Sequence, residues 1–313
     1  MTGVAGRTIV LALAWFACIN AIGSVLAAAL ASAIRNRTAT PRPSVLLGIR
    51  LLPASLSLFF VTAMFLPAHW ALEPRDAAET LGFALNAMAT AGAALLLRSA
   101  WRAVAIARAS RLVRVGSRLD PGGLPNTYVV DAWPGVSLAG IISPRILIGR
   151  TVKAELSRAE LDVAVAHEVA HRNAFDNLAR WCMLCAPDFL AVSAAGSRLE
   201  HDWRVAAESR ADARAICGDQ TRAVHLASAL IKVARLSAIP TERVFAPSWS
   251  TLNDSELLEW RVHRLLSGTP PQAEPVLRVG TITTTVGVFL LIVTPVLAES
   301  VHRLTEALVG LLP

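Results

Sequence analysis

Long uncharged stretches occur at four places in the chain, and each is long enough to cross a bilayer. A helix needs about 20 apolar residues to cover ~30 Å of hydrocarbon. The uncharged runs cover residues 8–34, 51–72, 80–97 and 279–298. We therefore predict four membrane-spanning helices. The first is expected to be retained, because its apolar run is far longer than the ~7–15 residues of a signal-peptide core.

The pattern changes between the third and fourth runs. Residues 101–277 have an ordinary density of charged residues and contain turn signals such as Asp120-Pro121-Gly122-Gly123. This stretch has the length of one folded domain. We predict a membrane domain of three helices over residues 1–100, a folded domain over residues 101–277, and a fourth helix with a short tail over residues 278–313.

The composition agrees with a membrane protein and excludes a disordered chain. Hydrophobic residues make up 54% of the sequence, charged residues 17%, and the mean hydropathy is +0.50. Four cysteines in 313 residues give no disulfide framework, which is typical of a reducing compartment.

The positive charges give the orientation. The net charge of +7 and the pI of about 10.2 are compatible with binding to nucleic acid or anionic lipid. However, the arginines cluster beside the first and third spans, and basic flanks stay on the cytoplasmic side. We predict an inner-membrane protein with its N-terminus outside and its folded domain in the cytoplasm, with no direct nucleic-acid partner. The flanking arginines are Arg35, Arg37, Arg42 and Arg50, then Arg98, Arg102, Arg108, Arg111, Arg114 and Arg118.

Capping signals predict helices in the folded domain. Ser157 and Glu160 have the spacing of a capping box at the start of a helix, and so do Ser197 and Glu200. Asp176 is expected to cap a helix between these two. Gly218 is a natural stop for the helix that begins near Ser197. These four boundaries define three predicted helices, and the candidate site residues lie on the first and the third.

The first of these helices carries the sequence His167-Glu168-Val169-Ala170-His171. Residues four apart project from one face of a helix, so both imidazoles can bind one metal ion. Glu168 is turned aside and can act as a general base on a water molecule. This is the arrangement that a zinc hydrolase needs. The alternative is two surface histidines on an amphipathic helix, in a surrounding too apolar to favour them.

A zinc hydrolase needs a third protein ligand. Glu208 and Asp212 lie four apart on a later predicted helix and share a face. We predict that Glu208 is the third ligand and that Asp212 orients one of the histidines through its other ring nitrogen. The alternative is that both are solvated acids in ordinary pairs with the neighbouring arginines at positions 204, 210 and 214.

Several segments together resemble the BlaR/MecR family of membrane metallopeptidases. The resemblance implies a mainly α-helical protein, in which multi-pass membrane helices accompany a cytoplasmic gluzincin-type zinc metallopeptidase domain with a small β-sheet. It also implies Zn²⁺ at His167, His171 and Glu208, with Glu168 as general base and Asp212 beside a ligand. The segments that carry it are residues 142–148 (ISPRILI), 156–161 (LSRAEL), 166–171 (AHEVAH), 176–177 (DN) and 208–212 (ESRAD).

The resemblance implies a zinc endopeptidase that cleaves a cytoplasmic protein, a transcriptional repressor, in a signalling response. Relatives that sense β-lactams continue into a penicillin-binding domain, whereas this sequence ends at Pro313. We therefore do not expect direct antibiotic sensing. Two alternatives remain: a quality-control protease that acts on membrane proteins, and a non-catalytic sensor or scaffold.

Two weaker signals concern the substrate. Residues 136–148 contain two short β-type runs around Gly140, which predict either an edge strand that receives substrate as an added strand or a purely structural hairpin. The side chain that would stabilise a developing oxyanion is undecided between Tyr128, His201 and His225.

Overall fold

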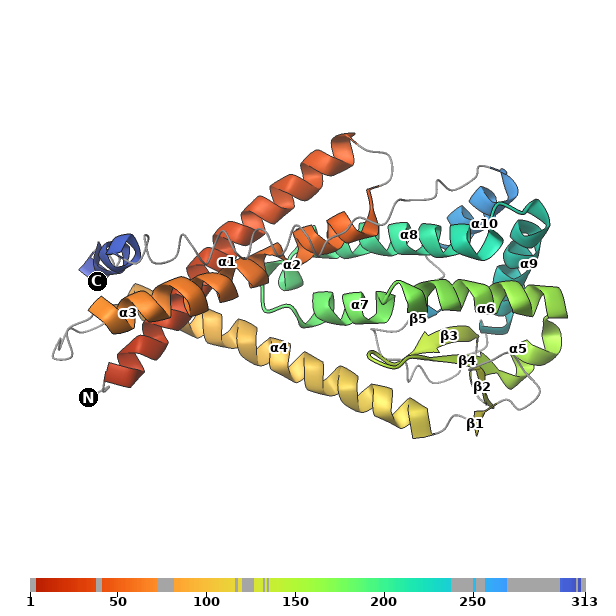
Figure 1. Ribbon diagram of the computed structural model, residues 1–313, viewed down its shortest axis with the longest axis horizontal. Coiled ribbons are helices and arrows are strands. Elements are labelled where there is room, and N and C mark those ends of the chain that lie inside the picture. The colour runs from red at the N-terminus through yellow and green to blue at the C-terminus, as the bar shows by residue number, and fades with distance from the viewer. Residues whose placement is uncertain are drawn as a thin grey trace.

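The computed structural model is an elongated molecule (Figure 1). Long helices gather at one end, and the sheet and the shorter helices lie at the other. The structure describes residues 4–37, 41–72, 82–115, 118–119, 127–131, 133, 135–237, 250–251, 257–268, 299–307 and 309–310.

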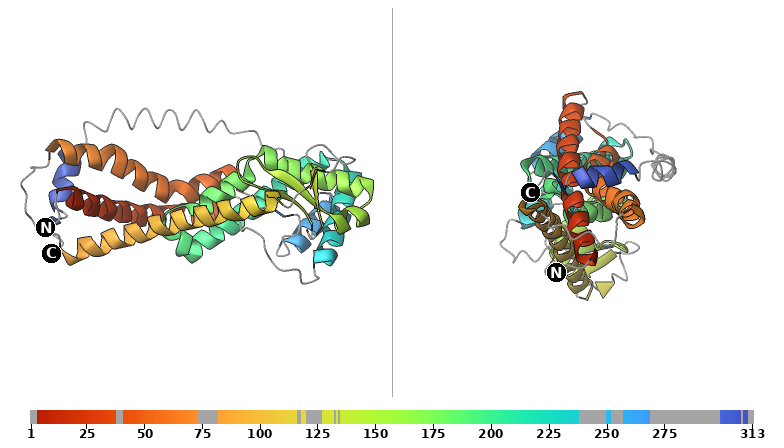
Figure 2. Two further views of the ribbon diagram at one scale, coloured as in Figure 1. Left: turned by 90° about the horizontal axis from the view of Figure 1, so that it is seen from below. Right: turned by 90° about the vertical axis from the view of Figure 1, so that its left-hand side faces the viewer.

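Three helices are long and apolar enough to cross a membrane, and they coincide with the first three predicted spans. The second is one continuous rod made of three consecutive elements. Helices form here because a segment in hydrocarbon must satisfy its own backbone polar groups. Figure 2 shows them running along one another. They are α1 (Val4–Arg37), α2 (Pro43–Phe59), the π-helix η1 (Phe60–Phe65), α3 (Leu66–Leu72) and α4 (Phe83–Val115).

Close packing of α1 on α4 depends on a glycine. A methyl group added at Gly92 of α4 would collide with the backbone carbonyl of Leu13 in α1. Small residues are what allow membrane helices to approach at their backbones. α4 also continues beyond its uncharged run, through Arg98 and Arg102 to Val115. The arginine-rich flank is therefore helical and extends the third span toward the folded domain.

The predicted fourth span, residues 279–298, lies outside the described residues. The described segments on either side of it lie at opposite ends of the molecule (Figure 1). α10 (Leu258–Leu266) belongs to the folded domain, whereas Thr305 accepts a hydrogen bond from Trp15 of α1 at 3.1 Å.

The sheet is small and mixed. Its strands are ordered β1-β2-β4-β3-β5, with β2 parallel to β4 and all other neighbours antiparallel. The predicted hairpin around Gly140 is present as β3 and β4. The outer edge of β3 is not open over its whole length, because Ser137 and Leu138 pair with β5. The strands are β1 (Arg118–Leu119), β2 (Thr127–Val130), β3 (Val136–Ala139), β4 (Arg145–Gly149) and β5 (Ser250–Thr251).

Helices cover the sheet and enclose the main core. Val136 and Leu138 of β3 and Ile146 and Ile148 of β4 are fully buried against apolar residues of α6 and α9. This cluster fixes α6 on the sheet. The helices of this part are α5 (Arg150–Glu155), α6 (Arg158–Asn173), α7 (Asp176–Cys185), the 3₁₀ turn η2 (Phe189–Val192), α8 (Ala194–Ile216), α9 (Gln220–Ser237) and α10.

The structure confirms one of the two capping boxes that the sequence predicts at helix starts. The capping box at Ser157 is confirmed, because its hydroxyl accepts from the Glu160 amide and the Glu160 carboxylate accepts from the Ser157 amide. The capping box predicted at Ser197 is wrong: α8 begins one turn earlier, where Ser193 caps the amide of Gly196. α8 ends at Ile216, close to the predicted stop at Gly218.

A buried arginine joins the membrane helices to the folded domain. Arg50 of α2 is fully buried, and its guanidinium contacts the equally buried Asp188 carboxylate at 2.7 Å. It also donates to the carbonyl of Met183 at 2.9 Å and to the carboxylate of Glu200 at 3.2 Å. Ions buried this deeply are stable only when paired, so this cluster holds α2 against the connector between α7 and α8.

The other two membrane helices bind the same connector. Asn20 of α1 donates to the carbonyl of Pro187 at 2.9 Å and accepts from the amide of Phe189 at 3.1 Å. Arg98 of α4 donates to the carbonyl of Ala191 at 3.2 Å. Residues 185–191 therefore contact all three of the described apolar helices.

Replacing Arg50 by methionine should destabilise the protein by roughly 3–5 kcal/mol, because the carboxylate of Asp188 would stay buried without its partner. The matched control is Arg35→Met, which removes a pair with Asp202 whose side chains are 43% and 29% exposed. That control should cost about 1 kcal/mol or less. Thermal unfolding in detergent micelles measures both; equal losses would contradict the structural role of Arg50.

Candidate metal centre

Helix α6 presents two imidazoles to one point. Its capped start fixes the helix, and burial of its apolar side against the sheet sets the rotation that turns His167 and His171 inward. Both rings are at most 1% exposed, and their Nε2 atoms lie 3.0 Å apart. Two ring nitrogens that face each other at this distance are positioned to bind one metal ion, as the four-residue spacing predicts.

Glu208 of α8 completes the cluster. Its Oε2 lies 3.3 Å from Nε2 of His167, and its Oε1 lies 3.5 Å from Nε2 of His171. Donor atoms of all three residues lie within 4.8 Å of one another, and all three residues are buried. α8 packs beside α6, so the predicted third ligand, 37 positions beyond His171, comes to the same place (Figure 1).

Each imidazole is backed by a carboxylate. Oδ1 of Asp212 lies 2.9 Å from Nδ1 of His167, which is the contact that the spacing on α8 predicts. Oδ2 of Asp176 lies 2.7 Å from Nδ1 of His171. A carboxylate on Nδ1 favours the tautomer that leaves the Nε2 lone pair for a metal ion. Both histidines are therefore oriented in the same way.

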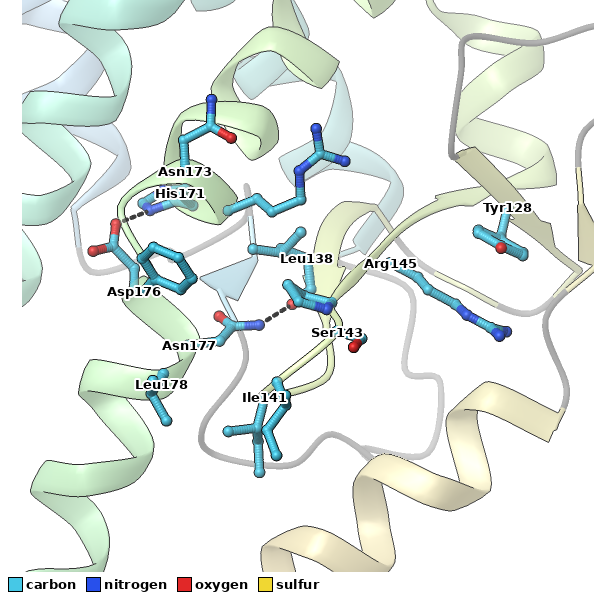
Figure 3. A pocket seen from close by; sticks show the side chains of 14 residues that line it. Tyr128, Leu138, Ile141, Ser143, Arg145, His171, Asn173, Asp176, Asn177 and Leu178 are labelled. Atoms are coloured by element: carbon cyan, nitrogen blue, oxygen red, sulfur yellow. Dashed lines mark hydrogen bonds and ion pairs between the residues drawn. The ribbon is translucent and has the colours of Figure 1, made fainter.

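The contact of Asp176 was not predicted, because the sequence suggests that this residue is a helix cap. The structure shows that Asp176 is the first residue of α7 and that Phe175 occupies the capping position with φ at +57°. This left-handed residue turns the chain between α6 and α7, so that the Asp176 side chain faces back toward His171 (Figure 3). A left-handed phenylalanine has no signature in the sequence.

Two arginines support the carboxylates. Arg210 donates to Oδ1 of Asp176, and Arg261 of α10 contacts both oxygens of Asp212 at 2.6 and 3.0 Å. Arg261 also lies 2.9 Å from Oε2 of Glu208. Burial raises the pKa of Glu208 and Asp212, but the Arg261 charge and the contacts with the histidines together outweigh it, and both pKa values lie below their ordinary range. Sequence reasoning treated Arg210 only as a possible surface pair and missed Arg261.

Glu168 differs from the other acids of the cluster. It is fully buried, and neither carboxylate oxygen has a hydrogen-bond partner among the described residues. Burial therefore raises its pKa to about 7, against the opposing effect of the two histidines. A carboxyl group of this kind can take up and release a proton near neutral pH, as a general base must.

A cleft opens beside His171. It has a volume of about 670 Å³ and lies between the β3–β4 turn and the junction of α6 with α7 (Figure 3). The buried amide of Asn177 fixes these two walls by donating to the carbonyls of Leu138 and Gly140 at 2.7 and 2.8 Å. The remaining lining includes Ile141, Ile142, Pro144, Arg145, Arg172 and Phe175.

The three candidates for oxyanion stabilisation are separated by the structure. Tyr128 lines the cleft that His171 also lines, and the guanidinium of Arg145 lies 4.7 Å above its ring. His201 lines a different pocket, together with Arg35 and Asp202. His225 is half-buried on α9. Among the three, Tyr128 is the one that shares a cavity with a predicted ligand.

Comparisons with known proteins add no family assignment. No protein-family model matches the chain, and no curated protein is significantly similar to it. The functional argument therefore rests on the residues and the geometry.

The metal-free protein should lose stability as the pH rises above neutral. Burial alone would lower the pKa of His171, but Glu208 and Asp176 raise it to about 10. A histidine whose folded pKa exceeds its unfolded value of 6.5 stabilises the fold fully below that pH, and this contribution disappears as the pH approaches 10. Thermal unfolding of chelator-treated protein across this range should show falling midpoints.

The control is Glu208→Gln, which removes the main charge that raises the pKa of His171. Its midpoints should fall less steeply over the same range. A wild-type midpoint that stays level or increases from neutral pH to pH 10 would contradict the described electrostatics.

Proposed function

We propose that this protein is an integral-membrane zinc endopeptidase. The single observation that carries the proposal is an unpartnered, buried Glu168 beside a cluster of two histidines and a glutamate that are themselves held by buried carboxylates. A buried carboxylate without a partner is costly in a purely structural site, whereas in a hydrolytic site it can serve as the general base. The BlaR/MecR-like sequence segments point to the same activity.

The donor set fits zinc. Two neutral imidazoles and one carboxylate are a common set of protein ligands for catalytic zinc, and they leave a coordination position open. His167, His171 and Glu208 would hold the ion. When bound, zinc supplies Lewis-acid activation of a scissile carbonyl and of water. Ca²⁺ and Mg²⁺ fit less well, because these ions favour oxygen ligands over imidazole.

The protein's own groups would carry the proton and hold the peptide. Glu168 takes a proton from the attacking water and transfers it to the nitrogen of the leaving amine, which is the task that a pKa of about 7 suits. Asp212 and Asp176 keep the two imidazoles in one tautomer throughout. The cleft beside His171 provides space for an extended stretch of substrate.

The substrate proposal follows from topology and resemblance. The arginine flanks support a cytoplasmic position for the folded domain, because basic segments next to spans stay inside. The resemblance to BlaR/MecR proteins suggests a transcriptional repressor as the protein that is cleaved. The site would then act on a cytoplasmic protein close to the inner membrane surface.

Replacing Glu168 by glutamine should abolish cleavage while zinc stays bound, because the ligands are unchanged and only the base is lost. Glu208→Gln is the matched variant and should lose zinc as well. Bound zinc is measured in purified protein, and N-terminal sequencing identifies protein fragments that accumulate with the wild type and vanish with Glu168→Gln. Identical fragments from both proteins would reject the protease and favour a scaffold; fragments of membrane proteins would favour quality control.

The orientation can be tested on Cys217, which is exposed at the end of α8. A membrane-impermeant maleimide should label it only after the inner membrane is permeabilised. Cys217→Ser gives the background from the half-buried and buried cysteines at positions 18, 182 and 185. Labelling of Cys217 in cells whose inner membrane is intact would place the folded domain outside.

A further inference from the structure

Arg261 is a buried cation inside the candidate metal centre. Its side chain is fully buried, and it is one of the two largest fully buried side chains among the described residues. It reaches the site from α10, which lies more than 40 residues beyond α8 in the chain. Taking a guanidinium out of water is unfavourable unless carboxylates surround it, and here two do.

The guanidinium contacts both acids of α8. Nη1 lies 2.9 Å from Oε2 of Glu208, while Nη2 and Nε contact the two oxygens of Asp212 at 2.6 and 3.0 Å. This fork on Asp212 is the geometry in which arginine binds carboxylates most strongly. One cation therefore neutralises a proposed metal ligand and the carboxylate that orients His167.

The same group also stands beside the donor atoms. Nη2 of Arg261 lies 3.5 Å from Nε2 of His167, the atom that faces His171 and Glu208. A divalent cation held by these donors would be placed next to a positive charge in a buried site. Repulsion between two cations at such a separation is strong where water is excluded.

We propose that Arg261 is an internal counter-ion that competes with the metal for the charge of Glu208 and so weakens metal binding. In the absence of metal it keeps the ligand carboxylate and Asp212 in place. When the metal binds, Arg261 and the metal ion share the negative charge of Glu208. The proposal rests on the proposed function for the identity of the ligands, and it assigns to α10 a role in metal loading.

α10 is held in place by contacts other than Arg261, so the charge can be removed while the helix stays docked. Leu265 is buried in the main core, and Leu258 and Val262 pack against it. Gln220 of α9 donates to the carbonyl of Leu265 at 3.5 Å, and Arg264 donates to the hydroxyl of Ser209. A neutral residue at position 261 therefore tests charge more than helix docking.

The experiment measures the Zn²⁺ dissociation constant of the full chain in detergent, by competition with a chromophoric chelator after removal of bound metal. Arg261→Gln and Arg261→Met should bind Zn²⁺ at least tenfold more tightly than the wild type. Arg261→Lys, which keeps the charge but loses the two-pronged contact with Asp212, should stay closer to the wild-type affinity than either neutral variant. Arg264→Gln is the matched control from the same helix and should not change the affinity.

Unchanged or weaker Zn²⁺ binding by neutral variants that retain the wild-type circular dichroism spectrum would overturn the proposal. If neither neutral variant folds, the lysine variant decides: a shift of more than tenfold despite the retained charge also overturns it. Tighter binding in the neutral variants without any proteolysis by the wild type would remove the proposed function and keep the role of Arg261. Proteolysis with equal affinities would do the reverse.

Discussion

Burial of four acidic side chains around two imidazoles is the constraint on which the folded domain depends. Glu168, Asp176, Glu208 and Asp212 are each at most 7% exposed, and isolated buried charges are strongly unfavourable. Arg210 and Arg261 neutralise three of these acids, while the pKa of about 7 lets Glu168 accept a proton. Helices α6, α7, α8 and α10 each contribute residues to this balance, so the charges are compensated only where the four helices pack together.

The same helices also connect the cluster to the membrane. α7 begins with Asp176 beside His171 and ends in the connector that binds Asn20, Arg50 and Arg98. α8 starts beside this connector and carries Glu208 and Asp212 about four and five turns later. The positions of the proposed ligand Glu208 and of Asp212, which contacts His167, are therefore set from the level at which the apolar helices meet the folded domain.

The sequence predicts those features of the structure that depend on hydrophobic periodicity and on the length of uncharged segments. Regular spacing and uncharged length predict three apolar helices, the capped start at Ser157, and the shared faces of His167 with His171 and of Glu208 with Asp212. Spacing within each helix does not show that these two faces meet. The rest depends on tertiary structure. The start of α8 moved by one turn because Ser193 competes with Ser197 as a cap, and neither the left-handed Phe175 nor the arrival of Arg261 leaves a local pattern.

Helix α8 carries Glu208 in the candidate metal centre, and it also packs against the membrane helices. Leu199, Trp203 and Ala207 pack into one apolar cluster with Ala27 and Ala31 of α1 and Leu46 and Ile49 of α2. A fragment that lacked the membrane helices would expose these apolar residues to water and would leave Asp188 without the charge of Arg50. Exposed apolar patches of this kind promote aggregation. The candidate metal centre therefore stays attached to the three apolar helices, and any molecule that reacts there must come to this fixed position.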